Sequence, residues 1–325
     1  MSLVLRDPQG REFRYLRLSV TDVCNFRCTY CLPNGFQKCK TTTELSLLEI
    51  SRLLKAFSAL SFKKIRLTGG EPTLRNDLPE IISEATRNGA TVGLTTNGYR
   101  LSEKIESYKD AGLSLLNLSL DSTSAEKFKL ITGKNEFANI QQGLEKALEL
   151  GIKKIKLNTV LLKGINDQDL ASFLDYVKKK PITLRFIELM QTGQNRDFFA
   201  KYHVRSNVFI KNLEEKGWQE VPRTSDAGPA IEYFHEDFNG RIGFISPYSN
   251  NFCSQCNRLR VSARGDLRLC LFGEGDISLR PYLQDDESLP NLIDFIQKTL
   301  QLKPESHFLE KGNYGDMQTL SSYGG

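Results

Sequence analysis

Short apolar runs alternate with amphipathic segments along the first 190 residues of the chain. Runs of apolar and β-branched residues predict six strands, at 15–20, 64–68, 91–96, 115–120, 155–160 and 183–188. Apolar residues at helical spacing predict helices between them, such as SLLEISRLLKAFSAL, LPEIISEATRNG, NIQQGLEKALELG and DLASFLDYVKKK. Two of these segments run into Asn-Gly or Leu-Gly, which is a helix C-terminal signal. The repeated strand–helix order predicts right-handed crossovers and a parallel sheet.

Polar residues interrupt these strands at Arg17, Arg66, Asn117, Lys156 and Arg185. Strands buried on both faces are normally continuous hydrophobic runs, and a buried cation is costly unless it is paired or hydrated. Recurrence on separate strands favours a polar lumen that holds an anion over scattered structural ion pairs. Six strand–helix units also suit an open doubly wound sheet, but the lumen favours an α/β fold with an incomplete (β/α)6 TIM-like barrel. Its site is expected at the C-terminal ends of the strands.

The composition changes after the sixth strand. The stretch Val221–Pro229 is rich in Pro, Gly and small polar residues, which indicates a soft boundary. Shorter strand-like runs follow (IEYFH, RIGFIS, RLRVSA, DLRLCLF), then a helix around Asn291–Leu302. We therefore predict a barrel domain at 1–225 and a smaller α+β domain at 226–310 that closes the barrel opening. Residues 311–325 have little apolar content and are typical of a tail.

Bulk composition is that of an ordinary globular protein: 325 residues, 39% hydrophobic and 26% charged. No apolar run is long enough to span a bilayer, and the N-terminus has no apolar signal core. We expect a cytoplasmic protein with no membrane association, where cysteines are metal ligands or reactive thiols rather than disulfides. The net charge of +5 fits an anionic ligand and is too small to indicate nucleic acid.

Three of the seven cysteines stand together in CNFRCTYC, as Cys24, Cys28 and Cys31. A disulfide would leave one of them over, and a structural zinc normally has four ligands, whereas no histidine is near in sequence. Buried inert cysteines are less consistent with a polar segment at a strand end, and a catalytic thiol needs no two companions. A cubane iron–sulfur cluster binds Cys thiolates, and three of them leave one iron free for an outside ligand.

A second set of three follows the pattern C-x2-C, then thirteen residues, then C: Cys253, Cys256 and Cys270. A zinc ribbon lacking one ligand is one interpretation. A second cluster with an open iron is the other, and it repeats the logic of the first set. The remaining cysteine, Cys39, is expected to be a bystander.

The spacing C-x3-C-x2-C after the first strand, together with GGEP at Gly69–Pro72, resembles the radical S-adenosylmethionine (SAM) superfamily. The resemblance implies that SAM chelates the open iron of a [4Fe-4S] cluster and is cleaved to a 5′-deoxyadenosyl radical. With both cysteine sets the chain looks like the MoaA family of GTP 3′,8-cyclases, which begin molybdenum cofactor biosynthesis. This narrower resemblance covers nearly the whole chain through CNFRCTYC, RLTGGEPTLR, TTNG, SLDS, KLNTV, RFIELM, FCSQCNRLR and the terminal Gly-Gly.

The resemblance also implies roles for residues at the matching positions. Three-cysteine ligation of one [4Fe-4S] cluster is implied for each set. SAM contacts are implied for Tyr30, Gly70, Ser119 and Met190. GTP contacts are implied for Arg17, Arg66, Thr95, Lys156, Arg258, Leu259 and Arg260. Catalytic roles are implied for Arg17, Lys156 and the C-terminal Gly324 and Gly325, although composition alone favours a disordered tail.

The implied partners are GTP, an external electron donor, the cyclic pyranopterin monophosphate synthase that receives the product, and a second copy of the chain. No nucleic-acid partner is expected. One rival is another radical SAM enzyme with an auxiliary cluster, such as a peptide-modifying maturase, which would usually have more C-terminal cysteines. A second rival is a zinc or iron–sulfur scaffold for nucleic acid, which would show clustered Lys/Arg with exposed aromatics.

Overall fold

A single large sheet organises the molecule. The computed structural model describes residues 4–37, 43–224, 227–250 and 252–324. Within these ranges twelve strands form one sheet in the order β14-β13-β12-β3-β4-β5-β6-β7-β8-β11-β10-β9. Its middle consists of β3 (Tyr15–Thr21), β4 (Lys64–Gly69), β5 (Thr91–Thr96), β6 (Leu113–Ser119), β7 (Lys154–Leu161) and β8 (Thr183–Glu188). These six strands pair in parallel in chain order, so the predicted parallel sheet is confirmed.

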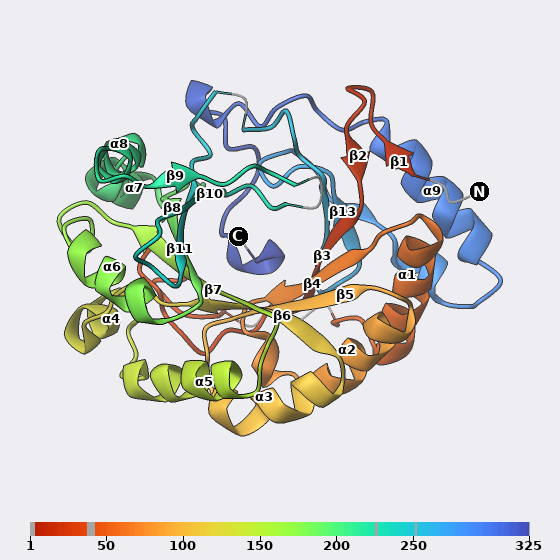
Figure 1. Ribbon diagram of the computed structural model, residues 1–325. Coiled ribbons are helices and arrows are strands. Elements are labelled where there is room, and N and C mark those ends of the chain that lie inside the picture. Colours follow the sequence, from red (N-terminus) through yellow and green to blue (C-terminus); the bar gives the residue numbers. More distant parts are fainter. Residues whose placement is uncertain (1–3, 38–42, 225–226, 251, 325) are drawn as a thin grey trace.

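Helices between these strands cover the outer face of the sheet, and the C-terminal segment lies in the space that the sheet surrounds (Figure 1). They are α1 (Leu47–Ala59), α2 (Leu78–Arg87), α3 (Leu101–Asp110), α4 (Ala125–Thr132), α5 (Phe137–Glu149) and α6 (Leu170–Lys179). The first of them shows how local sequence sets a helix. The Ser46 hydroxyl accepts from Glu49 N, and the Glu49 carboxylate accepts from Ser46 N, which forms a capping box. The predicted helix ends are also confirmed, because Gly89 and Gly151 follow α2 and α5 with left-handed φ.

The later strands extend both edges of the same sheet. On one side β12 (Arg258–Val261) pairs in parallel with β3, followed by β13 (Asp266–Arg268) and β14 (Ile277–Ser278). On the other side β11 (Arg241–Ile245) pairs in parallel with β8, followed by β10 (Ile231–Phe234) and β9 (Gln219–Glu220). The remaining elements are the hairpin β1 (Leu5–Arg6) and β2 (Glu12–Phe13), and the helices α7 (Arg196–Tyr202), α8 (Asn207–Glu215) and α9 (Leu289–Leu300).

One predicted strand is too long. The run DLRLCLF forms β13 only as far as Arg268, and the chain then turns around Cys270. Leu271 and Phe272 are buried, but they pack with the C-terminal segment rather than in a strand. The apolar pattern in this run therefore reflects packing of a turn.

The C-terminal segment packs inside the molecule. It contains the short 3₁₀ helices η3 (Leu309–Lys311) and η4 (Ser321–Tyr323). Its few apolar side chains, Met317, Leu320 and Tyr323, are buried in a cluster with Met190 and Phe272. The composition of the segment did not indicate this burial, because only three apolar side chains are needed to hold the segment in place. The predicted domain boundary at 225/226 and Gly325 fall outside the described residues.

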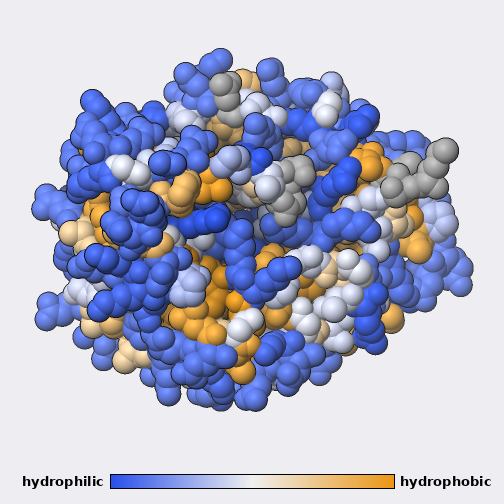
Figure 2. Space-filling model, viewed as in Figure 1, coloured by the Kyte–Doolittle hydropathy of each residue, from blue (hydrophilic) through white to orange (hydrophobic). Residues whose placement is uncertain are grey.

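Strand order and electrostatics agree that the sheet is strongly curved. Arg66 on β4 and Arg185 on β8 are four strands apart, which is about 19 Å across a flat sheet. Nevertheless burial, and then the charge of Arg66, lower the pKa of Arg185 to about 10. This influence indicates that the two side chains lie closer together than they would in a flat sheet, in agreement with the curved sheet in Figure 1. Hydrophilic residues cover most of the face seen in Figure 2. Nowhere in the described ranges is a helix long and apolar enough to cross a membrane.

Candidate active site

The first cysteine set lies in the loop that follows the C-terminal end of β3. The backbone of this loop is held on α4, because Arg27 N donates to the Thr132 carbonyl (3.1 Å) and Thr29 N to the Ile131 carbonyl (2.9 Å). Its thiols are near one another, and the three cysteines are half-buried. Burial, helped by the charges of neighbouring thiols and carboxylates, raises the pKa of Cys31 to about 12 and that of Cys28 well above its usual value. A buried group of thiols with raised pKa values is costly to ionise unless a cation binds them.

The donors of both cysteine sets are thiols, and thiolates are the ligands of iron–sulfur clusters. No three His, Cys, Asp or Glu side chains among the described residues converge on one point that could hold one metal ion.

A cavity of about 160 Å³ opens on the first set. It brings together the four residues expected at SAM, namely Tyr30, Gly70, Ser119 and Met190, with Cys24, Cys28, Cys31, Thr95 and Gly324. Gly70 is required for a reason that the sequence did not reveal. A Cβ at this position would lie 2.3 Å from the carbonyl oxygen of Val23, so the glycine lets the GGEP turn approach the cysteine loop.

The glutamate of GGEP has a structural task. Glu71 is fully buried, and its carboxylate accepts from Thr96 Oγ1 (2.6 Å), Asn97 N (2.6 Å) and Thr73 N (2.9 Å). It therefore ties the GGEP turn to the TTNG segment. The Asn97 side chain in turn donates to the Asn25 side chain at 3.0 Å, which reaches the cysteine loop.

Asp121 is a cavity residue that sequence reasoning missed, although SLDS contains it. The Tyr30 hydroxyl donates to its Oδ2 at 2.9 Å, and Val160 N donates to its Oδ1 at 2.8 Å. Burial raises the pKa of Asp121 to about 6, against the lowering effect of these two bonds. Asn97 and Asn158 also line the cavity. The signal that could have found them is their position in the sequence: Asn97 directly follows a predicted strand, and Asn158 lies within one.

Three of the expected GTP residues form a row across neighbouring strands. Arg260 on β12, Arg17 on β3 and Arg66 on β4 are register partners. Arg66 is 4% exposed; its Nη1 donates to the Leu94 carbonyl (3.1 Å) and its Nε to the Tyr15 hydroxyl (3.3 Å). The next strand supplies Gly93 opposite Arg66, where a Cβ would lie only 2.6 Å from the guanidinium carbon.

Within the described part of the chain, the guanidinium of Arg260 in this row lacks a full set of hydrogen-bond acceptors. Burial, followed by repulsion from Arg258 and Arg17, lowers the pKa of Arg260 to about 9. Its Nε is buried without a hydrogen-bond partner among the described residues. Buried guanidinium donors in excess of acceptors are the arrangement expected for a bound polyanion.

Lys156 and Arg185 extend the positive region to β7 and β8. Lys156 forms an ion pair with Glu232, and the Asn158 side chain accepts from Arg185 Nη2 at 2.6 Å. Burial and the charge of Arg185 lower the pKa of Lys156 to about 7, even though Glu232 opposes the shift. Leu259 is different, because strand alternation places its side chain in the main core, fully buried. Only its backbone is left to face a ligand.

In the second set, Cys253 and Cys256 precede β12, and Cys270 follows β13, which runs antiparallel to β12. All three cysteines therefore lie near the N-terminal ends of the parallel strands. Arg11 Nη1 donates to the Cys253 carbonyl at 2.9 Å. Burial raises the pKa of Cys256, but Lys303 and Arg258 outweigh it and bring the pKa to about 6. His307 stands 37 residues after Cys270 in the sequence. In the structure its backbone hydrogen-bonds Cys253, and its ring lies against Phe252 and Phe272.

The two sets are thus separated along the strands. Arg258, two residues after Cys256, is the register partner of Tyr15, and Thr21, three residues before Cys24, ends β3. Six residues of strand span about 20 Å. The arginine row crosses β12, β3 and β4 within this interval.

The C-terminal segment reaches the first set. The Leu320 backbone hydrogen-bonds the Cys31 thiol, and Gly324 lines the cavity. Gly324 has φ 58°, and a Cβ there would lie 2.0 Å from Thr68 Oγ1, so only glycine fits.

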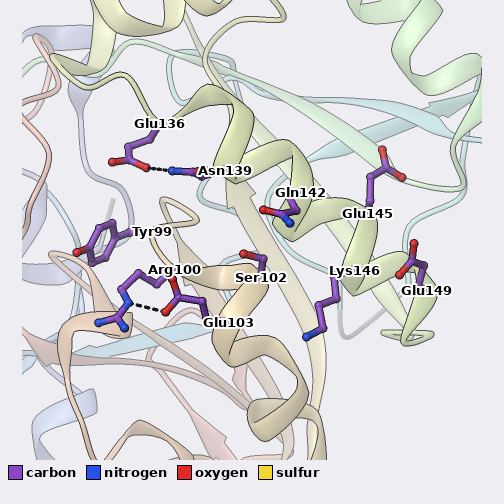
Figure 3. Close-up of a pocket in the computed structure, with 10 residues that line it drawn as sticks. All are labelled: Tyr99, Arg100, Ser102, Glu103, Glu136, Asn139, Gln142, Glu145, Lys146 and Glu149. Atoms are coloured by element: carbon purple, nitrogen blue, oxygen red, sulfur yellow. Dashed lines mark hydrogen bonds and ion pairs between the residues drawn. The ribbon is translucent and has the colours of Figure 1, made fainter.

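A larger cavity of about 780 Å³ lies on the outside, between α3 and α5 (Figure 3). Its side chains pair with one another, as in Arg100–Glu103 and Asn139–Glu136. It includes none of the expected site residues.

Comparison with known families assigns the class of protein. The model of the Radical SAM superfamily matches residues 18–177, and the model named Molybdenum Cofactor Synthesis C matches residues 182–309. The fold and the first cysteine set thus define a radical SAM enzyme. The second match begins at residue 182, directly before β8 and earlier than the predicted boundary.

Curated relatives narrow the class. A GTP 3′,8-cyclase of Yersinia pestis is 49% identical over 323 residues, covering 99% of both chains. One of Stenotrophomonas maltophilia (strain K279a) is 50% identical over 99% of both chains, and one of Synechococcus elongatus is 47% identical over 99% of this chain and 100% of that protein. The chain belongs to the GTP 3′,8-cyclase family.

Solved structures add a likeness of fold. Streptococcus suis SuiB bound to S-adenosylmethionine has a TM-score of 0.59 at 13% identity, covering 88% of this chain and 69% of that one. SuiB bound to its precursor peptide SuiA has a TM-score of 0.60 at 12% identity, covering 92% and 66%. At this identity the likeness shows the fold alone.

Proposed function

We propose that this protein converts GTP to (8S)-3′,8-cyclo-7,8-dihydroguanosine 5′-triphosphate, the first step of molybdenum cofactor biosynthesis. The observation that carries the proposal is the arginine row between two separate cysteine sets, in which Arg66 and Arg260 are buried and Arg17 is half-buried. A triphosphate is the multiply charged anion that such a row can bind. The names of the curated relatives support the same activity.

The architecture proposed for this function is a partial (β/α)6 barrel at 1–225 whose opening is closed by residues 226–310, with 311–325 reaching into the site. Strand order supports it, because β11 and β12 flank the six barrel strands on opposite sides. The two polypeptide edges therefore face each other across the opening. The curved sheet excludes bulk water from the reacting groups.

Each cysteine set is proposed to hold one [4Fe-4S] cluster through three thiolates: Cys24, Cys28 and Cys31 for the first, Cys253, Cys256 and Cys270 for the second. When bound, the first cluster and SAM would supply a 5′-deoxyadenosyl radical as the hydrogen acceptor. Joining C3′ to C8 would require loss of one hydrogen atom from C3′ and gain of one electron, from the external donor, and one proton at the guanine. Tyr30, Gly70, Ser119 and Met190 are proposed to hold SAM, and their shared cavity with the first set supports this.

The substrate is proposed to bind through Arg17, Arg66, Thr95, Lys156 and residues 258–260, the middle one through its backbone. Arg17 and Lys156 would fix the triphosphate so that the ribose stays at the first cavity, since position must supply the selectivity of a radical reaction. Gly324, with Gly325 beyond it, is proposed to enter the same cavity and complete the site. The contact of Gly324 with Thr68 supports this.

The proposed partners are an external electron donor, the cyclic pyranopterin monophosphate synthase that receives the product, and a second copy of the chain. The proposed location is the cytoplasm.

The test is an anaerobic reaction of the reconstituted protein with GTP, SAM and a reductant. We expect 5′-deoxyadenosine and a cyclised nucleotide in equal amounts. SuiB, which shares the fold, is described with a precursor peptide, so a peptide is the matched alternative substrate. Turnover with peptide and none with GTP would overturn the proposal.

A further inference from the structure

Arg268, at the end of β13, is a buried cation that the proposed chemistry does not use. It is 4% exposed. Its Nε donates to Asp276 Oδ1 and its Nη2 to Asp316 Oδ1, both at 2.7 Å. Its Nη1 faces the carbonyls of Leu271 and Gly273 at 3.3 and 3.4 Å. All three guanidinium nitrogens are therefore engaged, which gives the group one fixed orientation.

Two of these interactions lead to the C-terminal segment. Asp316 belongs to this segment, and its second oxygen, Oδ2, accepts from Gly275 N at 2.8 Å. The guanidinium carbon also lies 4.9 Å from the centre of the Tyr323 ring, within cation–π distance. Arg268 therefore grips the segment at both ends of the stretch 316–323.

The segment between these two points is aligned by backbone contacts. Gly193 N donates to the Met317 carbonyl (2.8 Å) and Gln194 N to the Gln318 carbonyl (3.3 Å). Gly315, with φ 61°, lies so close to the turn after Cys270 that a Cβ would be 2.5 Å from the Phe272 carbonyl oxygen. A segment placed this closely has one register, and Gly324 follows directly from it.

We propose that Arg268 is a positioning residue that latches residues 316–323 onto β13 and so delivers Gly324 to the first cavity. The inference rests on the proposed role of the C-terminal glycines. The apolar cluster around Met317, Leu320 and Tyr323 is separate from the main core of the sheet. Release of the segment therefore leaves the sheet and the strands that carry the arginine row intact.

The decisive variant is Asp316→Asn, because it removes the carboxylate that accepts from Arg268 Nη2. The substitution lies on the C-terminal segment and so leaves β13 and the turn at Cys270 unchanged. Glu310→Gln is the matched control: it removes the same charge from an exposed side chain six residues earlier. Asp316→Glu keeps the carboxylate and is expected to recover most of the activity. Arg268→Lys removes the planar fork, which a single ammonium cannot replace.

The measurements are amide hydrogen exchange of 317–323, iron content, and kcat and KM for GTP. For Asp316→Asn we expect about tenfold faster exchange and about tenfold lower kcat, with KM within about twofold, as loss of one charge-assisted hydrogen bond implies. Iron content and the exchange of β3–β8 should match those of the Glu310→Gln control.

The outcomes separate the two proposals. If the protein lacking 324–325 turns over normally, the role of the glycines is wrong, whatever Asp316 does. If that protein is inactive while Asp316→Asn retains wild-type kcat, the latch is wrong, with or without faster exchange. The latch is also wrong if Asp316→Asn loses iron together with kcat and Asp316→Glu does not restore both.

Discussion

Substitution of Gly93 by alanine tests the arginine row without removing any charged group. Gly93 lies opposite Arg66 in the register of β4 and β5, and its φ is outside the left-handed region. Alanine is therefore compatible with the strand backbone. The new Cβ would stand 2.6 Å from Arg66 Cζ and 2.7 Å from Nη1. A van der Waals contact of about 3.5 Å requires the guanidinium to retreat by about 1 Å.

A shift of this size disturbs the hydrogen bonds that hold the Arg66 guanidinium in place. Its bonds to the Leu94 carbonyl and the Tyr15 hydroxyl are already 3.1 and 3.3 Å long, so a retreat breaks at least one of them. A misplaced guanidinium loses a hydrogen bond to a charged ligand, which is worth about 1.5–3 kcal/mol. At about 1.4 kcal/mol per factor of ten, the affinity for GTP should fall by about tenfold to a hundredfold.

The assay is steady-state formation of the cyclised nucleotide under anaerobic conditions, with GTP binding measured in parallel. KM for GTP should rise while kcat changes little, because the lost contact is made equally in ground and transition states. Gly228→Ala is the control, since a Cβ there meets no atom within 4 Å. In an Arg66→Ala background, Gly93→Ala should have almost no further effect. A full effect in that background, or an unchanged KM in the single variant, would refute the role given to Arg66.

Three further predictions follow from the site. KM for GTP should rise as the pH increases from 6 to 8, because Lys156, with a pKa near 7, loses its positive charge over this range. Tyr15 gains a negative charge over the same range, since burial raises its pKa but Arg66 and Arg17 lower it to about 7. Lys156→Arg should flatten that profile, and an unchanged profile would contradict the assignment. Cys24→Ser or Cys253→Ser should each reduce iron from about eight to about four atoms per chain; loss of all iron from either variant would argue against two independent sites. Deletion of residues 324–325 should leave thermal unfolding and iron content unchanged and abolish cyclisation, and normal turnover would exclude a role for the glycines.

The local sequence pattern was enough to predict the central strands and the type of chemistry that their side chains support. The periods of apolar residues place all six strands from β3 to β8 within one or two residues of their observed bounds. Polar residues within those runs indicated the lumen, because a buried strand tolerates a cation only where something compensates it. The spacing of the cysteines likewise indicated thiolate ligation before any geometry was known.

Tertiary structure decided what depends on residues distant in sequence. It placed His307 beside Cys253, turned the Leu259 side chain into the core, and joined the later strands to both edges of one sheet. It also showed that Gly70 serves a backbone contact, and that Arg268 holds a segment some 50 residues away. Composition and periodicity report what each segment prefers within a few residues. Burial, ion pairing and steric fit depend on which segments the fold brings together.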